Sequence, residues 1–367
     1  MRIFQIIVTI TTGDAIGNNA LLLDNLFRSL GFETGIYAIN IDSRLSKTVV
    51  RDLKRLPQLT SQDIIIYHMC ESTIINAMLG EMHCKKIAVY HNTTPARFFA
   101  RFEPEQAKKQ VESLLEIKAL SSCFDWCIAD SEFNKADLVR MGYPKDRITV
   151  IPIMLNFEDY RKTPDQNVIK TYQDGRTNFL FVGRVAPNKC FEDVIQAYAY
   201  YKKHIDQNAR LFLVGAPFGG NYINYLREYV EIIEAEDVIF TGHVTFAEIL
   251  AYYSVADIFL CMSEHEGFCV PVIEAMIFGV PVLAFNSSAI KGTLGGCGIL
   301  LEEKDPVVAS LVIQRILNDK ALKDYIIDMQ KQRLNDFDVD RISKQFMSVL
   351  QHVAGGAFNE EDSHCRS

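Results

Sequence analysis

Short apolar runs alternate with helical patterns along the whole chain, and this alternation restricts the fold more than any other feature of the sequence. In the first half, the runs predict strands at 3–10, 34–40, 64–68, 86–90, 126–129 and 148–152. In the second half, they predict strands at 178–182, 210–214, 238–241, 258–261, 281–284 and 298–300. Strands that alternate with helices form parallel sheets covered by helices on both faces. The sequence therefore predicts an α/β protein with two such sheets.

The chain is longer than one hydrophobic core usually supports, so two domains are expected. A polar segment at 156–177, which contains Pro164, Asp165 and Gly175, separates the two series of strands. We expect a first domain at 1–155, a linker at 156–177, a second domain at 178–353 and a polar tail at 354–367. The final helix, at 339–353, could close the second domain or cross back to the first, and the sequence leaves both alternatives open.

Composition argues against several classes of protein. A net charge of −8 disfavours a nucleic-acid groove, which needs a dominant basic surface. The apolar start, 1–8, breaks at 11–14 without a small-residue cleavage site, so it indicates a first strand rather than a signal peptide. Apolar runs elsewhere are too short to span a bilayer, and the nine scattered cysteines are typical of reduced thiols. A cytoplasmic protein is expected.

Two cations follow the strand at 178–182. Gly183 and Arg184 come directly after the strand, and Lys189 precedes the next helix. In an open parallel sheet, ligands bind at the carboxyl ends of strands. Arginine offers a planar fork and lysine a mobile point charge, which suits a diphosphate. The alternative is a solvated loop.

A second motif occupies 263–275, with the sequence Ser-Glu-His-Glu-Gly-Phe-Cys-Val-Pro-Val-Ile-Glu-Ala. Pro271 favours the first turn of a helix, so 267–270 form an entry loop whose amides make an anion site. Glu266 then lies before the helix and Glu274 about one turn inside it. Two carboxylates beside a diphosphate are reasonable only if they bind sugar and ribose hydroxyls while Arg184 and Lys189 offset the charge. Helix capping would explain Glu274 but not the glycine-containing loop.

The Glu-x7-Glu pattern of Glu266 and Glu274, together with Val-Gly-Arg-x-x-x-x-Lys at 182–189, resembles retaining glycosyltransferase family 4. The resemblance extends over most of 1–353 and implies the GT-B fold, in which two Rossmann-like domains face each other across a cleft. The segments 241–244 and 256–258 resemble the family's base-binding loop and its helix-to-strand step. The resemblance also implies retention of the anomeric configuration by a same-face mechanism. Separately, the residues indicate no metal site, because His265 and Cys269 offer two ligands without a third, so no metal ion or other cofactor is expected.

The resemblance assigns roles to the second-domain residues. Glu266 would contact the donor sugar as a catalytic residue, Glu274 the ribose, and His243 and Val244 the base. The diphosphate would be held by Arg184, Lys189, Gly267, Phe268, Cys269 and Val270.

Candidates in the first domain follow two of its strands. The loop after 3–10 carries Gly13, Asp14 and Gly17, and the resemblance implies that it is an acceptor-side loop that also approaches the donor phosphate. The loop does not match the dinucleotide fingerprint Gly-x-Gly-x-x-Gly. His91 ends the strand at 86–90 and is the catalytic candidate of this domain, because the resemblance puts a similar histidine near the anomeric centre. The alternative is a histidine that holds its loop by hydrogen bonds. Ser131 and Asn134 resemble a segment at the cleft edge, although Ser131 is equally a helix cap.

Cations and aromatic residues interleave after His91. The run consists of Arg97, Phe98, Phe99, Arg101 and Phe102. This pattern is typical of peripheral contact with the inner face of a membrane. It is also typical of a helix with its apolar face in the core and its arginines snorkelling to solvent, which is the commoner case.

Together these features predict a hexosyltransferase. The donor would be a nucleotide diphosphate-sugar, and the acceptor a glycan or a lipid-linked glycan in bacterial polysaccharide or O-antigen assembly. One alternative is a catalytically silent nucleotide-sugar-binding subunit of a glycosyltransferase complex. Another is an epimerase or phosphorylase on the same fold.

Overall fold

The computed structural model describes residues 1–11, 13–46 and 48–355 and divides the chain into two compact units. Unit 1 comprises the described residues of Met1–Thr93 and Lys108–Asn156, together with 337–355. Unit 2 comprises Thr94–Ala107 and Phe157–Asp336. The predicted polar tail lies outside the described residues, except for its first two positions.

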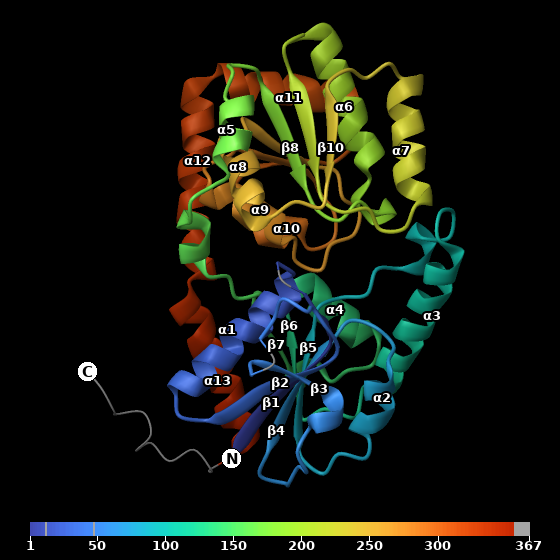
Figure 1. The fold of residues 1–367 in the computed structure, drawn as a ribbon, viewed down its shortest axis with the longest axis vertical. Coiled ribbons are helices and arrows are strands. Elements are labelled where there is room, and N and C mark those ends of the chain that lie inside the picture. The colour runs from blue at the N-terminus through green and yellow to red at the C-terminus, as the bar shows by residue number, and fades with distance from the viewer. Residues whose placement is uncertain (12, 47, 356–367) are drawn as a thin grey trace, which may run out of the picture. The chain divides into compact units, whose positions relative to one another are not determined.

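Unit 1 contains a seven-stranded parallel sheet with the order β3-β2-β1-β4-β5-β6-β7 (Figure 1). Its strands are β1 (Arg2–Ile10), β2 (Glu33–Ile41), β3 (Val50–Asp52), β4 (Ile64–Met69), β5 (Lys85–Tyr90), β6 (Trp126–Ala129) and β7 (Ile148–Val150). Its helices are α1 (Ala15–Ser29), α2 (Ile74–Leu79), α3 (Pro104–Ala119, which starts in unit 2), α4 (Glu132–Arg140) and α13 (Val339–Ala354). Short 3-10 turns lie at Leu53–Arg55 and Lys145–Arg147. The strand β3 was not predicted, because two of its three residues are exposed and the segment carries no apolar run.

Strand β4 shows why this sheet is covered on both faces. Ile64 and Ile66 belong to one hydrophobic cluster, whereas Ile65 and Tyr67 belong to another on the opposite face. Side chains alternate between the faces of a strand, so a continuous apolar run requires burial on both sides. Helices α1 and α13 contribute to the first cluster, and α2, α3 and α4 contribute to the second.

The last helix, α13, packs on the sheet of unit 1. Its apolar residues Ile342, Phe346, Val349 and Leu350 are buried in the cluster that contains Ile64. The ring of Phe346 lies 6.3 Å from that of Phe27 on α1. The sequence left open whether this helix closes the second domain or crosses back to the first. In the structure it crosses back and packs on the first sheet (Figure 1).

Unit 2 contains a six-stranded parallel sheet with the order β10-β9-β8-β11-β12-β13. Its strands are β8 (Asn178–Val182), β9 (Arg210–Val214), β10 (Val238–Gly242), β11 (Ile258–Cys261), β12 (Val282–Phe285) and β13 (Ile299–Leu301). Its helices are α5 (Gln166–Tyr172), α6 (Phe191–His204), α7 (Asn221–Ile232), α8 (Phe246–Val255), α9 (Val270–Ile277), α10 (Ile290–Leu294), α11 (Pro306–Asn318) and α12 (Lys320–Leu334). Its 3-10 turns are η2 (Ala96–Phe98), η4 (Phe157–Arg161) and η5 (Pro187–Lys189), while η6 (Asn335–Phe337) leads toward α13. The prediction of two parallel α/β sheets is confirmed.

Two segments of unit 2 fall outside the predicted second domain. The predicted linker, 156–177, contains η4 and α5, and the amide of Asp165 donates to the carbonyl of Ala247 at 2.9 Å, which ties the segment to α8. The segment 94–107, expected in the first domain, groups with unit 2 because its aromatic rings pack there. The ring of Phe99 lies 5.3 Å from Phe218, and that of Phe102 lies 5.0 Å from Tyr222.

This packing changes the interpretation of the aromatic run. Phe99 is buried, and the rings of Phe98 and Phe102 face His265 and Tyr225 within unit 2. The guanidinium of Arg97 lies over Phe98, and that of Arg101 over Phe102. The structure therefore does not support the predicted membrane patch, since unit 2 itself engages the three phenylalanine rings.

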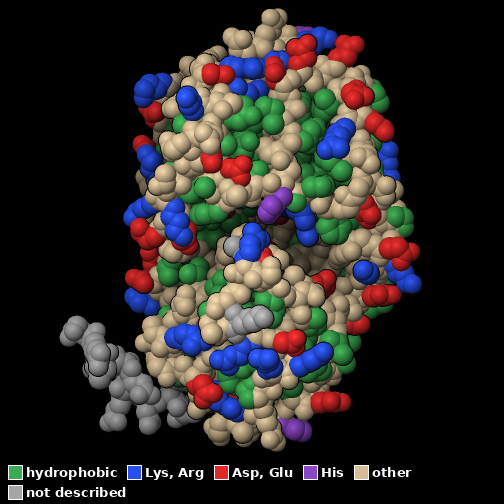
Figure 2. Space-filling view, in the orientation of Figure 1, with side chains coloured by type: hydrophobic (Ala, Val, Ile, Leu, Met, Phe, Trp, Pro, Cys, Tyr) green, Lys and Arg blue, Asp and Glu red, His purple; other side chains and the backbone are tan. Residues whose placement is uncertain are grey.

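The surface charge and the length of the apolar helices bear on whether the chain could bind a nucleic acid or cross a membrane. Figure 2 shows Lys and Arg side chains interspersed with Asp and Glu over the face that it draws, without a broad basic field. Among the described helices, none is long and apolar enough to cross a membrane. The cysteines of the described ranges are all free thiols.

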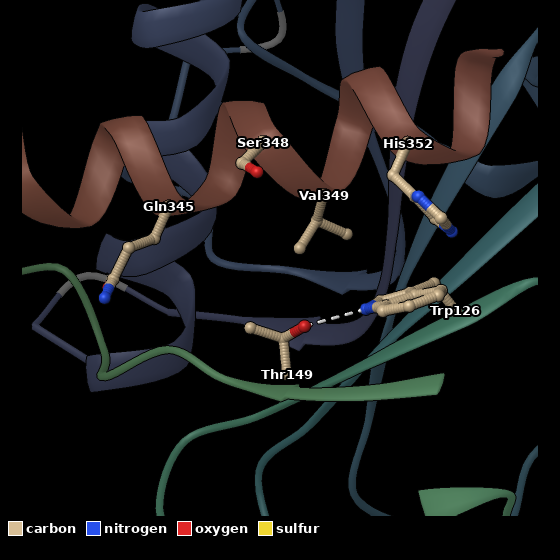
Figure 3. A pocket seen from close by; sticks show the side chains of 6 residues that line it. All are labelled: Trp126, Thr149, Gln345, Ser348, Val349 and His352. Atoms are coloured by element: carbon tan, nitrogen blue, oxygen red, sulfur yellow. Dashed lines mark hydrogen bonds between the residues drawn. The ribbon is translucent and has the colours of Figure 1, made fainter. Parts of the chain in front are cut away.

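A pocket of about 290 Å³ lies in unit 1 between α13 and the strands β6 and β7 (Figure 3). The indole N–H of Trp126 donates to Thr149 Oγ1 at 2.9 Å, and the His352 ring lies 4.5 Å from the Trp126 ring. None of the six lining residues is among the predicted site residues. The pocket is thus lined by residues of α13, β6 and β7 alone.

The packing of α13 predicts a stability effect. We expect Phe346→Ala to lower the free energy of unfolding by about 3 kcal/mol, because truncation of a buried phenylalanine removes apolar contacts and leaves a cavity. Urea denaturation followed by circular dichroism measures it. Lys344→Ala, at an exposed position of the same helix, is the control and should stay within about 0.5 kcal/mol of wild type. Equal effects of the two substitutions would contradict the packing of α13 on unit 1.

Candidate donor-binding site

The loop after β8 presents one exposed cation and one enclosed cation. The guanidinium of Arg184 is exposed and lies 4.8 Å from the centre of the Phe218 ring. Lys189 ends η5, and its side chain is only 17% exposed. The loop runs close to the end of β9, where a Cβ atom on Gly215 would lie 2.0 Å from the carbonyl oxygen of Gly183. Only glycine at 215 leaves room for the loop after β8 to approach the end of β9 this closely.

The loop after β11 is held from both sides. The amide of Glu266 donates to Ser288 Oγ at 2.9 Å, and Thr293 Oγ1 donates to the carbonyl of Phe268. Cys269 has a left-handed backbone with φ of 72° and is the N-cap of α9, whose first residue is Val270. Pro271 stands at the start of the helix, as predicted. The first amides of α9 and of the loop before it form the kind of helix start that binds anions.

The structure brings the two loops together, although 77 residues separate their contacts. Lys189 Nζ lies 2.6 Å from Glu266 Oε1. The amide of Glu264 donates to the carbonyl of Asn188 at 2.9 Å, and Asn188 Nδ2 donates to the carbonyl of His265 at 2.9 Å. The two sequence motifs are thus parts of one site at the carboxyl ends of β8 and β11.

The electrostatics of this site centre on the buried ammonium of Lys189. Burial acts to lower the pKa of Lys189, but the carboxylate of Glu266 more than offsets it, and the pKa is raised above its usual value. Lys189 therefore stays charged. A buried cation of this kind costs desolvation energy, and a pairing carboxylate keeps that cost tolerable.

Two clusters bring together residue types that ligate metal ions. The ligand atoms of Cys261, Glu266 and Cys269 lie within 4.8 Å of one another, as do those of Cys190, Asp193 and Glu264. Each cluster already contains an ammonium group. Lys189 pairs with Glu266, and Lys304 Nζ lies 2.7 Å from Asp193 and 2.8 Å from Glu264. These ammonium groups supply the positive charge that a metal ion would bring.

Glu274 lies near the middle of α9 and accepts two hydrogen bonds from tyrosines. Tyr160 OH donates to Oε1 at 3.0 Å, and Tyr253 OH donates to Oε2 at 2.8 Å. Burial raises the pKa of Glu274, while the two phenols act in the opposite direction. The loop with His243 and Val244 follows β10, and Phe246, at the start of α8, packs on Tyr160 with ring centres 5.6 Å apart. Tyr160 therefore contacts both Glu274 and the helix that the predicted base-binding loop enters.

In unit 1, His91 belongs to a hydrogen-bonded row across four neighbouring strands. His91 Nδ1 lies 2.8 Å from Asp130 Oδ2, and its Nε2 lies 2.8 Å from His68 Nδ1. His68 Nε2 lies 2.9 Å from Gln5 Oε1, and Gln5 Nε2 donates to the carbonyl of Ala20. Only 1% of the His91 side chain is exposed. Because both ring nitrogens of His91 are engaged, the geometry favours a structural role, in which His91 holds its loop, rather than a catalytic role.

The protons of this row can be counted. Because Gln5 Nε2 donates to Ala20, Gln5 Oε1 must accept from His68 Nε2. Three hydrogen bonds then need three protons shared among His68, His91 and Asp130, so the group is neutral overall. Burial lowers the pKa of His68 and raises that of Asp130, and both directions oppose an isolated charge.

The remaining first-unit candidates have structural roles. Asp14 is the N-cap of α1, and its Oδ2 accepts from the amide of Gly17 at 3.0 Å. A Cβ on Gly17 would lie 3.0 Å from Ile10 Cγ1, whereas Gly13 has a left-handed φ of 87° in open space. Ser131 caps α4, and Asn134 is buried between Asn92 and the carbonyl of Tyr90. These contacts hold the loops in place.

The sequence interpretation missed several of these partners. Tyr253 lies in an apolar helical run and Tyr160 in the predicted linker, so no local motif marked either tyrosine as a site residue. The position of His68 could have marked it as a site residue, because His68 and His91 stand at the carboxyl ends of consecutive predicted strands, which pair in the sheet. Asn188 lies between the two predicted phosphate contacts and could have been found by its place in the loop.

Comparison with known proteins agrees with this geometry. Residues 163–333 match the family model described as glycosyl transferases group 1. O-antigen chain mannosyltransferase B of Escherichia coli is 27% identical over 199 residues, which are 53% of this chain and 52% of that protein. The alignment thus spans about half the length of that relative. The capsular polysaccharide biosynthesis glycosyltransferase CapM of Staphylococcus aureus is 24% identical over 318 residues, which are 81% of this chain and 80% of CapM.

Solved structures share the whole fold. Anabaena HepE in complex with UDP-glucose has a TM-score of 0.75 and 18% identity and covers 96% of this chain and 100% of that structure. WaaG, a glycosyltransferase involved in lipopolysaccharide biosynthesis, has a TM-score of 0.71 and 13% identity, with 96% and 100% coverage. The chain therefore has the GT-B fold, and its residues 163–333 match the model of the glycosyl transferases group 1 family.

Proposed function

We propose that this chain is a retaining glycosyltransferase of family 4. It would transfer a hexose from a nucleotide diphosphate-sugar to a glycan or lipid-linked acceptor in bacterial polysaccharide or O-antigen assembly. The joined loops after β8 and β11 carry the proposal, because they put Lys189, Glu266 and the start of α9 at one edge of the unit 2 sheet. The relatives named for O-antigen and capsule synthesis support the choice of pathway class.

The charges in this site suit a diphosphate. Arg184 presents an exposed guanidinium, and among the described residues it has no carboxylate partner. Lys189 and the α9 helix start add a second cation and oriented amides. Glu266 pairs with Lys189 in this structure. With a donor bound, the phosphate would share that ammonium, and Glu266 would turn to the sugar hydroxyls. His243 and Val244 would contact the base, and the loop with Gly13, Asp14 and Gly17 would lie on the acceptor side.

The proposed transfer needs no protein general base. In a same-face mechanism, the bond between the anomeric carbon and the phosphate oxygen breaks while the acceptor oxygen bonds to the same face. The leaving phosphate takes the acceptor proton, and cations stabilise the charge that develops on it. This agrees with His91, whose ring nitrogens are both engaged by Asp130 and His68.

A first prediction tests donor binding. In a thermal-shift screen of UDP-, GDP-, dTDP- and ADP-sugars without added metal, one nucleotide series should raise the midpoint of the wild type. At a hundredfold excess over Kd the stabilisation is about 2.7 kcal/mol, or about 5–10 °C. Glu274→Ala should weaken binding about tenfold or more, because it removes hydrogen bonds to a charged group. Glu303→Ala, an exposed carboxylate of the same unit, is the control and should shift like wild type. Absence of a shift with all four series would contradict the proposal.

A second prediction concerns stereochemistry. The product should have the anomeric configuration of the donor, which the proton coupling at the new anomeric centre reports by NMR. The spectrum must be taken on the first product formed. An inverted coupling constant would rule out retention while leaving the donor site in place.

A third prediction separates the two roles of His91. We expect His91→Ala and His68→Ala each to lower the free energy of unfolding by about 1–3 kcal/mol, because each substitution leaves buried polar partners unsatisfied. Turnover should fall only as far as the loss of folded protein explains. A loss of kcat of about a hundredfold or more in His91→Ala, with the stability of wild type, would instead identify a catalytic ring.

A further inference from the structure

The carboxylate of Glu274 is held at both oxygens by residues from two different elements. Tyr160 comes from η4 and donates to Oε1, whereas Tyr253 comes from α8 and donates to Oε2. The donor–acceptor distances are 3.0 Å and 2.8 Å. A carboxylate with one donor can rotate about its last bond, but one with a donor at each oxygen is fixed in its plane.

Both tyrosines are themselves held by packing. The Tyr160 ring lies against Phe246 at 5.6 Å, and the Tyr253 ring stacks on Phe278 at 5.4 Å. Tyr253 is fully buried, and its OH also lies 3.2 Å from the carbonyl of Pro271 in the first turn of α9. Burial raises the pKa of both phenols, so each keeps its proton and remains a donor. The two hydroxyls therefore act as fixed points for Glu274.

The hydrogen-bond acceptor sites that remain on the Glu274 carboxylate have a defined arrangement. An ionised carboxylate accepts about four hydrogen bonds, about two at each oxygen. Among the described residues the tyrosines take one at each oxygen. One further acceptor site is then left on each of two oxygens in a fixed plane, which matches two neighbouring hydroxyls. The 2′-OH and 3′-OH of a ribose are such a pair, and a 2′-deoxyribose lacks one of them.

We propose that Tyr160 and Tyr253 are positioning residues that hold Glu274 for the ribose diol, so that the site selects ribonucleoside diphosphates over their 2′-deoxy forms. This inference rests on the proposed function, in which Glu274 binds the donor ribose. It adds the two tyrosines and the class of nucleotide that they select. The tyrosines act through Glu274 and need not touch the nucleotide.

The test compares affinities for matched nucleotides. Isothermal titration calorimetry on the full chain gives Kd for UDP and 2′-deoxy-UDP and for GDP and 2′-deoxy-GDP. The wild type should prefer the ribonucleotide of the pair that it binds by about tenfold or more, the value of one hydrogen bond to a charged group. Tyr160→Phe, Tyr253→Phe and Glu274→Gln should each reduce this preference at least about threefold.

The matched control is Tyr198→Phe. Tyr198 is also a fully buried tyrosine of unit 2, but its OH donates to the carbonyl of Glu236 at 2.8 Å, away from Glu274. This substitution should lower stability without changing the preference for the ribonucleotide. Because the preference is a ratio measured on one sample, partial unfolding of a variant does not alter it.

The outcomes distinguish the two levels of the claim. If the preference falls in Glu274→Gln but stays at the wild-type value in both tyrosine variants, Glu274 is a ribose ligand and the positioning role is overturned. If the wild type binds both members of a pair equally, the selection of ribose is overturned while the nucleotide site stands. If the wild type binds none of the four nucleotides and no series of the thermal-shift screen raises its midpoint, the proposed function fails, and this inference fails with it.

Discussion

Each sheet of this protein is parallel and apolar on both faces, and this constraint determines where everything else lies. A strand such as β4, with Ile64, Ile65 and Ile66 in a row, must be buried on both sides, so helices cover both faces and the loops gather at the two ends of the strands. The carboxyl ends are then the place where backbone groups and polar side chains from distant segments meet. The contacts between Lys189 and Glu266, and between His68 and His91, both lie there.

The polar contacts at these edges differ in their physical role. The row from Gln5 to Asp130 is neutral overall and satisfies its members completely, which is how a buried polar network avoids a penalty. The pair of Lys189 and Glu266 keeps a full charge in a mostly enclosed place. Such a pair contributes little to stability compared with apolar side chains of similar volume. A ligand with negative charge would explain why the cation is retained, and Arg184 beside it adds a second charge at the surface.

Much of this arrangement could be predicted from the sequence because its signals are local. The apolar runs gave most of the strands, and the spacing of Glu266, Pro271 and Glu274 correctly put a helix start between the two carboxylates. Asp14 and Ser131 act as the caps that short polar residues before helices usually are. The family model matched at 163–333 agrees with the motifs found there.

The remainder depended on contacts between residues far apart in the chain. The amphipathic pattern of α13 shows that one face is buried but not which sheet buries it. The phenylalanines and arginines of 94–107 are of the residue types that would also form a membrane patch. Packing in the core and contact with a membrane can be told apart only by the contacts with the rings of Phe218 and Tyr222. Tyr160 was taken as part of a polar linker, and its hydrogen bond to Glu274 joins residues 114 positions apart. No local pattern could have predicted these pairings.

The central claim is that the loops after β8 and β11 form a diphosphate site. A crystal structure of the full chain with bound UDP or GDP tests it most directly. In that structure the diphosphate should contact Arg184, Lys189 and the amides at the start of α9, and the ribose hydroxyls should contact Glu274. A nucleotide bound elsewhere in the same crystals, with Lys189 still paired to Glu266, would contradict it.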